Sequence, residues 1–189
     1  MGQNAMKHRV NIITAVNAKA VSKDGNIYTV AGVVGAVDDL VMNGRMYPAD
    51  ELKRSAAQLD GKPAPAGHPK NSKGQHISAT NGEALASAWI GAYCTNARHE
   101  GGRTVCDIKI NAAAAKAHPD GEKLVQMLDD AIAGASVDPI HVSTGVFLRE
   151  IAANGESRGK QYRAIATDLQ YDHLAILLHE KGAGTPADG

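Results

Sequence analysis

The chain carries no excess of charge of either sign, because its 20 basic and 20 acidic residues cancel. A nucleic-acid-binding protein needs a positive field to hold phosphates, and a neutral chain does not supply one. Long apolar runs are also lacking. No stretch approaches the roughly 20 apolar residues of a membrane-spanning helix, and residues 1–9 contain no apolar signal segment. We therefore expect a soluble, cytoplasmic protein with no nucleic acid or membrane as its main partner.

Cysteine is scarce, since Cys94 and Cys106 are the only two. They flank Gly101-Gly102, which is expected at the tip of a hairpin, so the two thiols could face each other across the strands. In the cytoplasm they should be reduced, although such facing positions would permit a disulfide under oxidation. No Cys-x-x-Cys pair is present, so the sequence favours neither a metal site nor a cofactor.

A chain of 189 residues suits one domain with a sizeable core. We expect that domain over residues 1–180. A flexible Gly- and Ala-rich tail over residues 181–189 should follow, of a kind that could link to a scaffold region.

Runs rich in β-branched residues alternate with turn signals along the chain. Strands are expected over residues 9–16, 27–37, 84–96, 103–110, 140–152, 160–168 and 171–178, with turns at Asn43-Gly44, Gly101-Gly102 and residues 154–157. One helix should run from Pro48 to about residue 60. Another should cover residues 122–133, with Leu124, Val125, Leu128 and Ile132 in the core. This pattern predicts a mainly β protein, a barrel or a sandwich, with a few flanking helices.

Ser143 lies in an apolar, strand-like run, with His68 upstream and His173 downstream. A serine becomes a nucleophile only where a base removes its proton, and a neutral imidazole suits that role. His68 is the candidate base. A further group must then fix the tautomer of the base and stabilise its charged form.

His173 and its neighbour Asp172 are alternatives for that third position. Adjacent residues of a regular strand point to opposite faces, so we expect only one of the two to face the site. His141 lies two residues before Ser143 and should share its face of the strand. The alternative is a purely structural role, in which these polar residues are hydrogen-bonded packing groups and take no part in catalysis.

Three segments, in this order along the chain, resemble the motifs of phage prohead maturation proteases, which are grouped with the herpesvirus assemblins. They are Gly67-His68-Pro69, Val142-Ser143-Thr144-Gly145 and Asp172-His173-Leu174-Ala175-Ile176. The resemblance implies an orthogonally packed β-barrel surrounded by a few helices. It also implies a serine endopeptidase with Ser143 as nucleophile, His68 as base and His173 as third member. Asp172 remains the alternative third member, because many phage relatives use an acidic residue there.

The resemblance further implies an oxyanion site just after the third member. Assemblins have a loop rich in glycine and arginine at that place, where this chain has a lysine and no arginine. The backbone N–H groups of Lys181 and Gly182 are the expected donors.

The implied substrates are the scaffold protein, the major capsid protein and the protease itself. All would be cut inside the procapsid in the host cytoplasm, by a homodimer or higher oligomer. The missing arginine suggests an alternative, namely a catalytically inactive capsid or scaffold component with the same fold. A metal-dependent hydrolase is a third class, but no two of His76, His99 and His118 have the short helical spacing of metal ligands.

Overall fold

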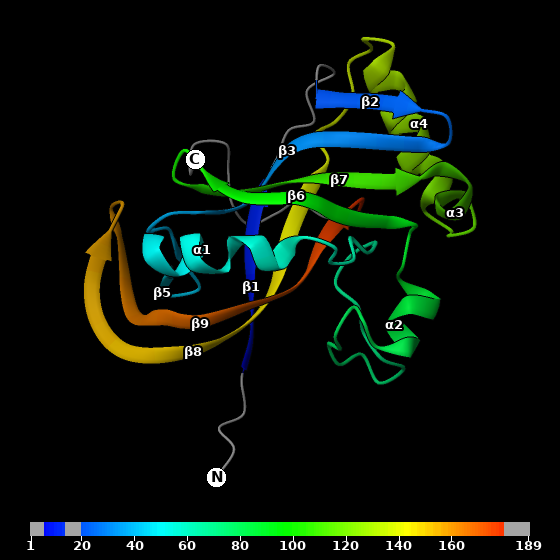
Figure 1. The fold of residues 1–189 in the computed structure, drawn as a ribbon. Coiled ribbons are helices and arrows are strands. Elements are labelled where there is room, and N and C mark those ends of the chain that lie inside the picture. The colour runs from blue at the N-terminus through cyan, green and yellow to red at the C-terminus, as the bar shows by residue number, and fades with distance from the viewer. Residues whose placement is uncertain (1–5, 14–19, 180–189) are drawn as a thin grey trace.

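The strands form two sheets (Figure 1) in the computed structural model, which describes residues 6–13 and 20–179. The first sheet has the order β1-β8-β9-β5-β4, and its strands are β1 (Met6–Ile13), β4 (Val41–Met42), β5 (Arg45–Met46), β8 (His141–Ser157) and β9 (Lys160–Leu177). The second has the order β2-β3-β7-β6, and its strands are β2 (Val21–Asp24), β3 (Ile27–Val37), β6 (Ala92–Glu100) and β7 (Arg103–Asn111). Pairing is antiparallel except between β5 and β9, which are parallel.

Short helices flank the sheets. They are α1 (Ala49–Ser55), the 3-10 helix η2 (Ala56–Leu59), α2 (Gly82–Ser87), α3 (Ala112–Lys116) and α4 (Gly121–Ile132). The predicted mainly β protein with flanking helices is therefore confirmed as an α+β fold. The predicted helices that begin after Pro48 and near residue 122 are also confirmed. Within the described ranges, no helix has both the length and the apolar character needed to cross a lipid bilayer.

The prediction of an orthogonally packed barrel is wrong in one respect, because the described strands form no closed barrel. β6 and β9 do not pair with each other, since the extended residues 62–67 lie between them. Pro63 and Pro65 accept backbone hydrogen bonds from β9 at 3.2 and 2.8 Å, and Ala64 between them donates to β6 at 2.9 Å. Proline suits these two positions because only its carbonyl is used there. This segment links the sheets and leads directly into His68.

The hairpin turns are partly as predicted. Asn43-Gly44 and Gly101-Gly102 connect neighbouring strands with positive φ at both residues, which is the type I′ geometry. The β8–β9 turn, however, lies at Arg158-Gly159, with φ values of 49° and 73°, and not at residues 154–157. The predicted break near Asp168 is a register shift within the continuous strand β9, where Asp168 has a φ of 51°. The long β8–β9 hairpin therefore curves alongside α1 (Figure 1).

Two predictions about apolar residues are wrong. Residues 84–91 do not begin a strand, because Asn81 caps α2 by accepting a hydrogen bond from the backbone N–H of Glu83. Trp89 therefore lies between α2 and β6, where it is 44% exposed. Ile132, at the end of α4, is 43% exposed, whereas the other three predicted core positions of that helix are buried.

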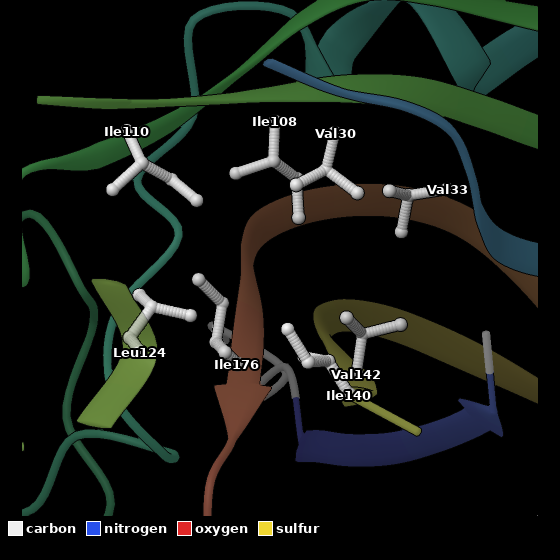
Figure 2. Close-up of a pocket in the computed structure, with 8 residues that line it drawn as sticks. All are labelled: Val30, Val33, Ile108, Ile110, Leu124, Ile140, Val142 and Ile176. Carbon is white, nitrogen blue, oxygen red and sulfur yellow. The ribbon is translucent and has the colours of Figure 1, made fainter. Parts of the chain in front are cut away.

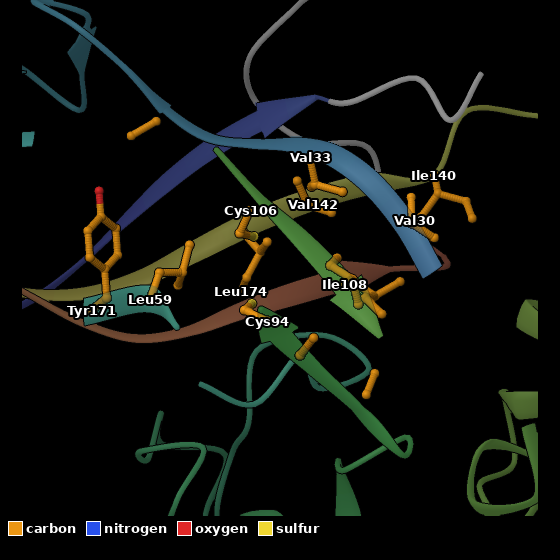
Figure 3. Close-up of a cluster of buried hydrophobic side chains, with 14 of the residues drawn as sticks. Val30, Val33, Leu59, Cys94, Cys106, Ile108, Ile140, Val142, Tyr171 and Leu174 are labelled. Carbon is orange, nitrogen blue, oxygen red and sulfur yellow. The ribbon is translucent and has the colours of Figure 1, made fainter. Parts of the chain in front are cut away.

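The core lies between the two sheets. In Figure 2, side chains of β3 and β7 face those of the region around β8 and β9, and α4 contributes Leu124 at one side. Figure 3 shows Cys94 and Cys106 beside Leu174 in this layer. The cysteines are not directly opposite, since Cys94 pairs in register with Ile108, but both are buried and free. A hydrogen bond with Cys106, together with burial, raises the pKa of the Cys94 thiol.

Candidate active site

Ser143 lies on β8 in the interior of the first sheet. Its backbone is paired with Asn11 of β1 on one side and with Ala175 of β9 on the other. A central strand holds its side chains rigidly, because both edges are hydrogen-bonded. Ser143 has no exposed surface in this structure.

The structure brings His68 to Ser143 across 75 residues of sequence. His68 Nε2 lies 2.7 Å from Ser143 Oγ, which is hydrogen-bonding distance. The chain reaches this position after residues 62–67 through Gly67, whose φ of 68° is strained for any residue with a side chain. The turn at Gly67 directs the next side chain toward β8.

His173 lies on the far side of the His68 ring. Its Nε2 is 2.8 Å from His68 Nδ1, and the two rings meet edge to face with centroids 5.0 Å apart. His173 therefore contacts the candidate base, and Asp172 contacts His173. His173 is only 4% exposed, so water does not compete freely for this bond.

Asp172 also belongs to the site, so the expectation that only one of the pair faces it is wrong. Gly145 of β8 pairs with His173, whereas Val146 pairs with Tyr171, which leaves Asp172 as an extra residue in a β-bulge. The bulge breaks the alternation of faces. As a result, Asp172 Oδ2 lies 2.6 Å from His173 Nδ1.

The loop before α2 holds the Asp172 carboxylate in place. Ser78 Oγ donates a short hydrogen bond to Oδ1, and the backbone N–H of Ala79 donates to Oδ2 at 3.0 Å. Neither Ser78 nor Ala79 was a predicted site residue, since nothing in their local sequence marks them as partners of a carboxylate more than 90 residues away.

These hydrogen bonds control the ionisation of Asp172. Burial opposes the charged form, but hydrogen bonds from His173, Ser78 and Ala79 outweigh it and lower the pKa of Asp172 from 3.8 to about 2. Asp172 is therefore a carboxylate at any pH at which the site would operate.

The lowered pKa predicts an effect on stability. Because the folded pKa lies below the unfolded value, ionised Asp172 stabilises the fold by about 2 kcal/mol above pH 4, and this is lost as the pH falls through about 2. Asp172→Asn removes the titration. The difference in free energy of unfolding between the wild type and this variant should narrow by about that amount between pH 5 and pH 2 in urea denaturation. If the difference in free energy of unfolding stayed constant over this pH range, the lowered pKa of Asp172 would be contradicted.

Gly145 makes room for the His173 ring. A Cβ atom at this position would lie 2.2 Å from Cε1 of His173, far inside van der Waals contact. One residue earlier, Thr144 donates a hydrogen bond to the carbonyl of Gly35 on β3 at 2.6 Å, which ties the two sheets together close to Ser143.

Six further residues were singled out from the sequence for the site or for a metal. Lys181 and Gly182, the expected oxyanion donors, fall outside the described residues. His141 is half-buried, and its Nδ1 has no hydrogen-bond partner in the described part of the chain. The three histidines considered for a metal site have separate neighbours: His76 meets the ring of His68 edge to face, His99 pairs with Asp38, and His118 contacts the carbonyl of Ser87.

The arrangement as a whole is a buried hydroxyl connected through two imidazoles to a carboxylate. Such a chain can accept the hydroxyl proton, hold the resulting imidazolium and return the proton to a leaving group. A hydroxyl held at hydrogen-bonding distance from an imidazole is the arrangement that general-base activation requires.

The fold is similar to a solved structure, that of the bacteriophage T4 capsid assembly protease gp21. The similarity has a TM-score of 0.53, covers 90% of this chain and 98% of that chain, and is accompanied by 9% sequence identity. At such low identity it shows the fold alone, so the predicted prohead protease fold is supported, whereas the relationship to assemblins stays a prediction. No protein-family profile and no curated protein sequence matches the chain.

Proposed function

We propose that the chain is a serine endopeptidase of the prohead protease type, with Ser143 as nucleophile, His68 as general base and His173 as third member. The observation that carries this proposal is the continuous contact from Ser143 Oγ through His68 to His173, at 2.7 and 2.8 Å. The similarity in fold to the T4 capsid assembly protease supports peptide hydrolysis over other acyl-transfer reactions.

The proposed reaction begins with attack of Ser143 Oγ on the scissile carbonyl while His68 Nε2 takes the hydroxyl proton. His68 then gives this proton to the leaving amine as the C–N bond breaks, and an acyl-enzyme remains. Water, deprotonated by the same imidazole, hydrolyses that ester and regenerates the serine. His173 keeps the His68 ring oriented throughout. The backbone N–H groups of Lys181 and Gly182 are the proposed oxyanion donors.

The proposed substrates are the scaffold protein, the major capsid protein and the chain itself, cut inside the procapsid in the host cytoplasm. This assignment rests on the resemblance of the three motifs and on the capsid assembly role of gp21. A homodimer or higher oligomer is proposed as the working form. Residues 181–189 are the proposed linker to a scaffold region.

One observation favours a second candidate function, a capsid or scaffold component without activity. Ser143 has no exposed surface, so a substrate carbonyl reaches its Oγ only after neighbouring groups move. A shell-building protein on the same fold would need no such movement.

Covalent labelling distinguishes the two candidates. A fluorophosphonate should modify the wild-type chain on the peptide that contains Ser143, detected by mass spectrometry, and Ser143→Ala should abolish the label. Ser22→Ala, which replaces an exposed serine on β2, is the matched control and should leave labelling intact.

Co-expression with candidate capsid and scaffold proteins gives the second readout. These proteins should be shortened by the wild type and remain full length with Ser143→Ala. An unlabelled wild-type chain, together with capsid proteins of unchanged length, would leave only the structural role.

A further inference from the structure

Asp172 lies behind the three residues of the proposed triad and contacts the third of them, His173, at 2.6 Å. We propose that Asp172 is a positioning residue that sets which nitrogen carries the proton in both histidines, and that Ser78 and Ala79 hold it for this purpose. This inference rests on the proposed function, in which His68 must accept a proton from Ser143.

The direction of each hydrogen bond follows from the charge of Asp172. An ionised carboxylate can only accept hydrogen bonds, so His173 Nδ1, at 2.6 Å from Oδ2, must carry a hydrogen. A neutral His173 then has only a lone pair at Nε2, and His68 Nδ1, at 2.8 Å, must donate to it. The lone pair of His68 is thereby left on Nε2, where Ser143 Oγ lies 2.7 Å away.

Without the carboxylate, a histidine as third member does not determine which ring donates in the hydrogen bond to His68. A neutral imidazole has two tautomers, and the one with a hydrogen on Nε2 would donate to His68 Nδ1. His68 would then carry its own hydrogen on Nε2, pointing at Ser143, and could not accept the hydroxyl proton. Asp172 excludes that arrangement, because its oxygen cannot donate to His173.

The surroundings of Asp172 fix its carboxylate against rotation. Ser78 Oγ binds one oxygen, whereas Ala79 N–H and His173 Nδ1 share the other. Asp172 is 6% exposed, so these partners are not exchanged freely with water. The bulge turns Asp172 toward the same side as His173. Two successive residues of β9 can therefore hydrogen-bond to each other and extend the chain of contacts from Ser143.

The tautomers can be read directly, without any catalytic assay. In the full-length chain labelled with ¹⁵N-histidine, two-bond ¹H–¹⁵N correlation spectra at pH 8 distinguish a ring protonated on Nδ1 from one protonated on Nε2. At that pH a histidine of ordinary pKa is neutral. The wild type should show Nδ1–H for both His68 and His173, with the signals assigned through His68→Gln and His173→Gln.

Asp172→Asn should convert His173 to a mixture with a substantial Nε2–H population. It should also lower kcat by about 10²-fold with KM unchanged, which is less than the roughly 10⁴-fold seen where the carboxylate touches the base directly. Asp38→Asn is the matched control, because Asp38 pairs with His99 at 2.9 Å away from the site. That variant should leave both tautomers and kcat unchanged.

Ser78→Ala is the milder variant and decides the question if Asp172→Asn does not fold. It frees one carboxylate oxygen and should give a detectable Nε2–H population on His173, with a smaller decrease in kcat. A wild-type His173 protonated on Nε2 would overturn the inference, as would wild-type tautomers in Asp172→Asn or, where that variant does not fold, in Ser78→Ala. If the tautomers are as expected but Ser143 takes no phosphonate label, the proposed function fails while the proton arrangement stands.

Discussion

His68→Ala is expected to lower kcat for cleavage of a capsid or scaffold substrate by about 10⁴- to 10⁶-fold. The reason is that His68 Nε2, 2.7 Å from Ser143 Oγ, is the proposed acceptor of the hydroxyl proton. KM should change little, because the imidazole acts on the reacting atoms more than on the rest of the substrate. The measurement is a steady-state assay of purified variant and wild type on the same substrate, followed by gel or mass spectrometry.

The matched control is His99→Ala. His99 is also a histidine paired with another side chain, Asp38, but it lies on β6 of the second sheet. Its replacement should leave kcat at the wild-type value. Equal losses in the two variants would point to a general effect on folding, and an active His68→Ala variant would remove His68 from the mechanism.

Gly145→Ala is expected to lower kcat by about 10²-fold through a steric effect alone. The added methyl would lie 2.2 Å from Cε1 and 2.5 Å from Nδ1 of the His173 ring. The ring cannot move away without breaking its bonds to His68 and Asp172, so either the imidazole or the β8 backbone must shift. A displacement of about 1 Å typically costs on the order of 10²-fold in rate, and overpacking costs about 1–3 kcal/mol of stability.

Gly82→Ala provides the comparison for this variant. Gly82 begins α2, and a Cβ added there meets no atom within 4 Å. Alanine favours a helix more than glycine does, so stability should stay the same or rise slightly. Activity and thermal unfolding are measured for both variants. If Gly145→Ala kept wild-type kcat, the close packing of His173 on β8 would not be needed for function.

The elements that could be predicted from the sequence are those with strong local signals. Asn43-Gly44 and Gly101-Gly102 form turns because both dipeptides tolerate positive φ, and the amphipathic stretch after residue 121 forms α4. The contact between Ser143 and His68 has no local signal. It was predicted from the residue types and their order along the chain, and the resemblance to prohead proteases, which relates segments far apart in the chain, implied the same pair.

The features that were missed depend on tertiary structure. Asp172 and His173 act on the same side of β9 only because of a bulge, and the sequence around them reads as a regular strand. Residues 84–91 were predicted as strand, but an apolar run rich in alanine is compatible with either a strand or a helix. The N-cap hydrogen bond at Asn81 favours the helix. Ser78 joins the site through a loop whose path no local pattern specifies.

The position of residues 62–67 has a consequence for heat inactivation. This segment is hydrogen-bonded to β9 of the first sheet and to β6 of the second, and it ends at Gly67, immediately before His68. Any partial separation of the sheets on warming would pull the imidazole away from the hydroxyl while most of the core was still folded. The proposed peptidase activity would then be lost below the main melting temperature. The difference between the two temperatures would measure how firmly residues 62–67 hold the sheets together.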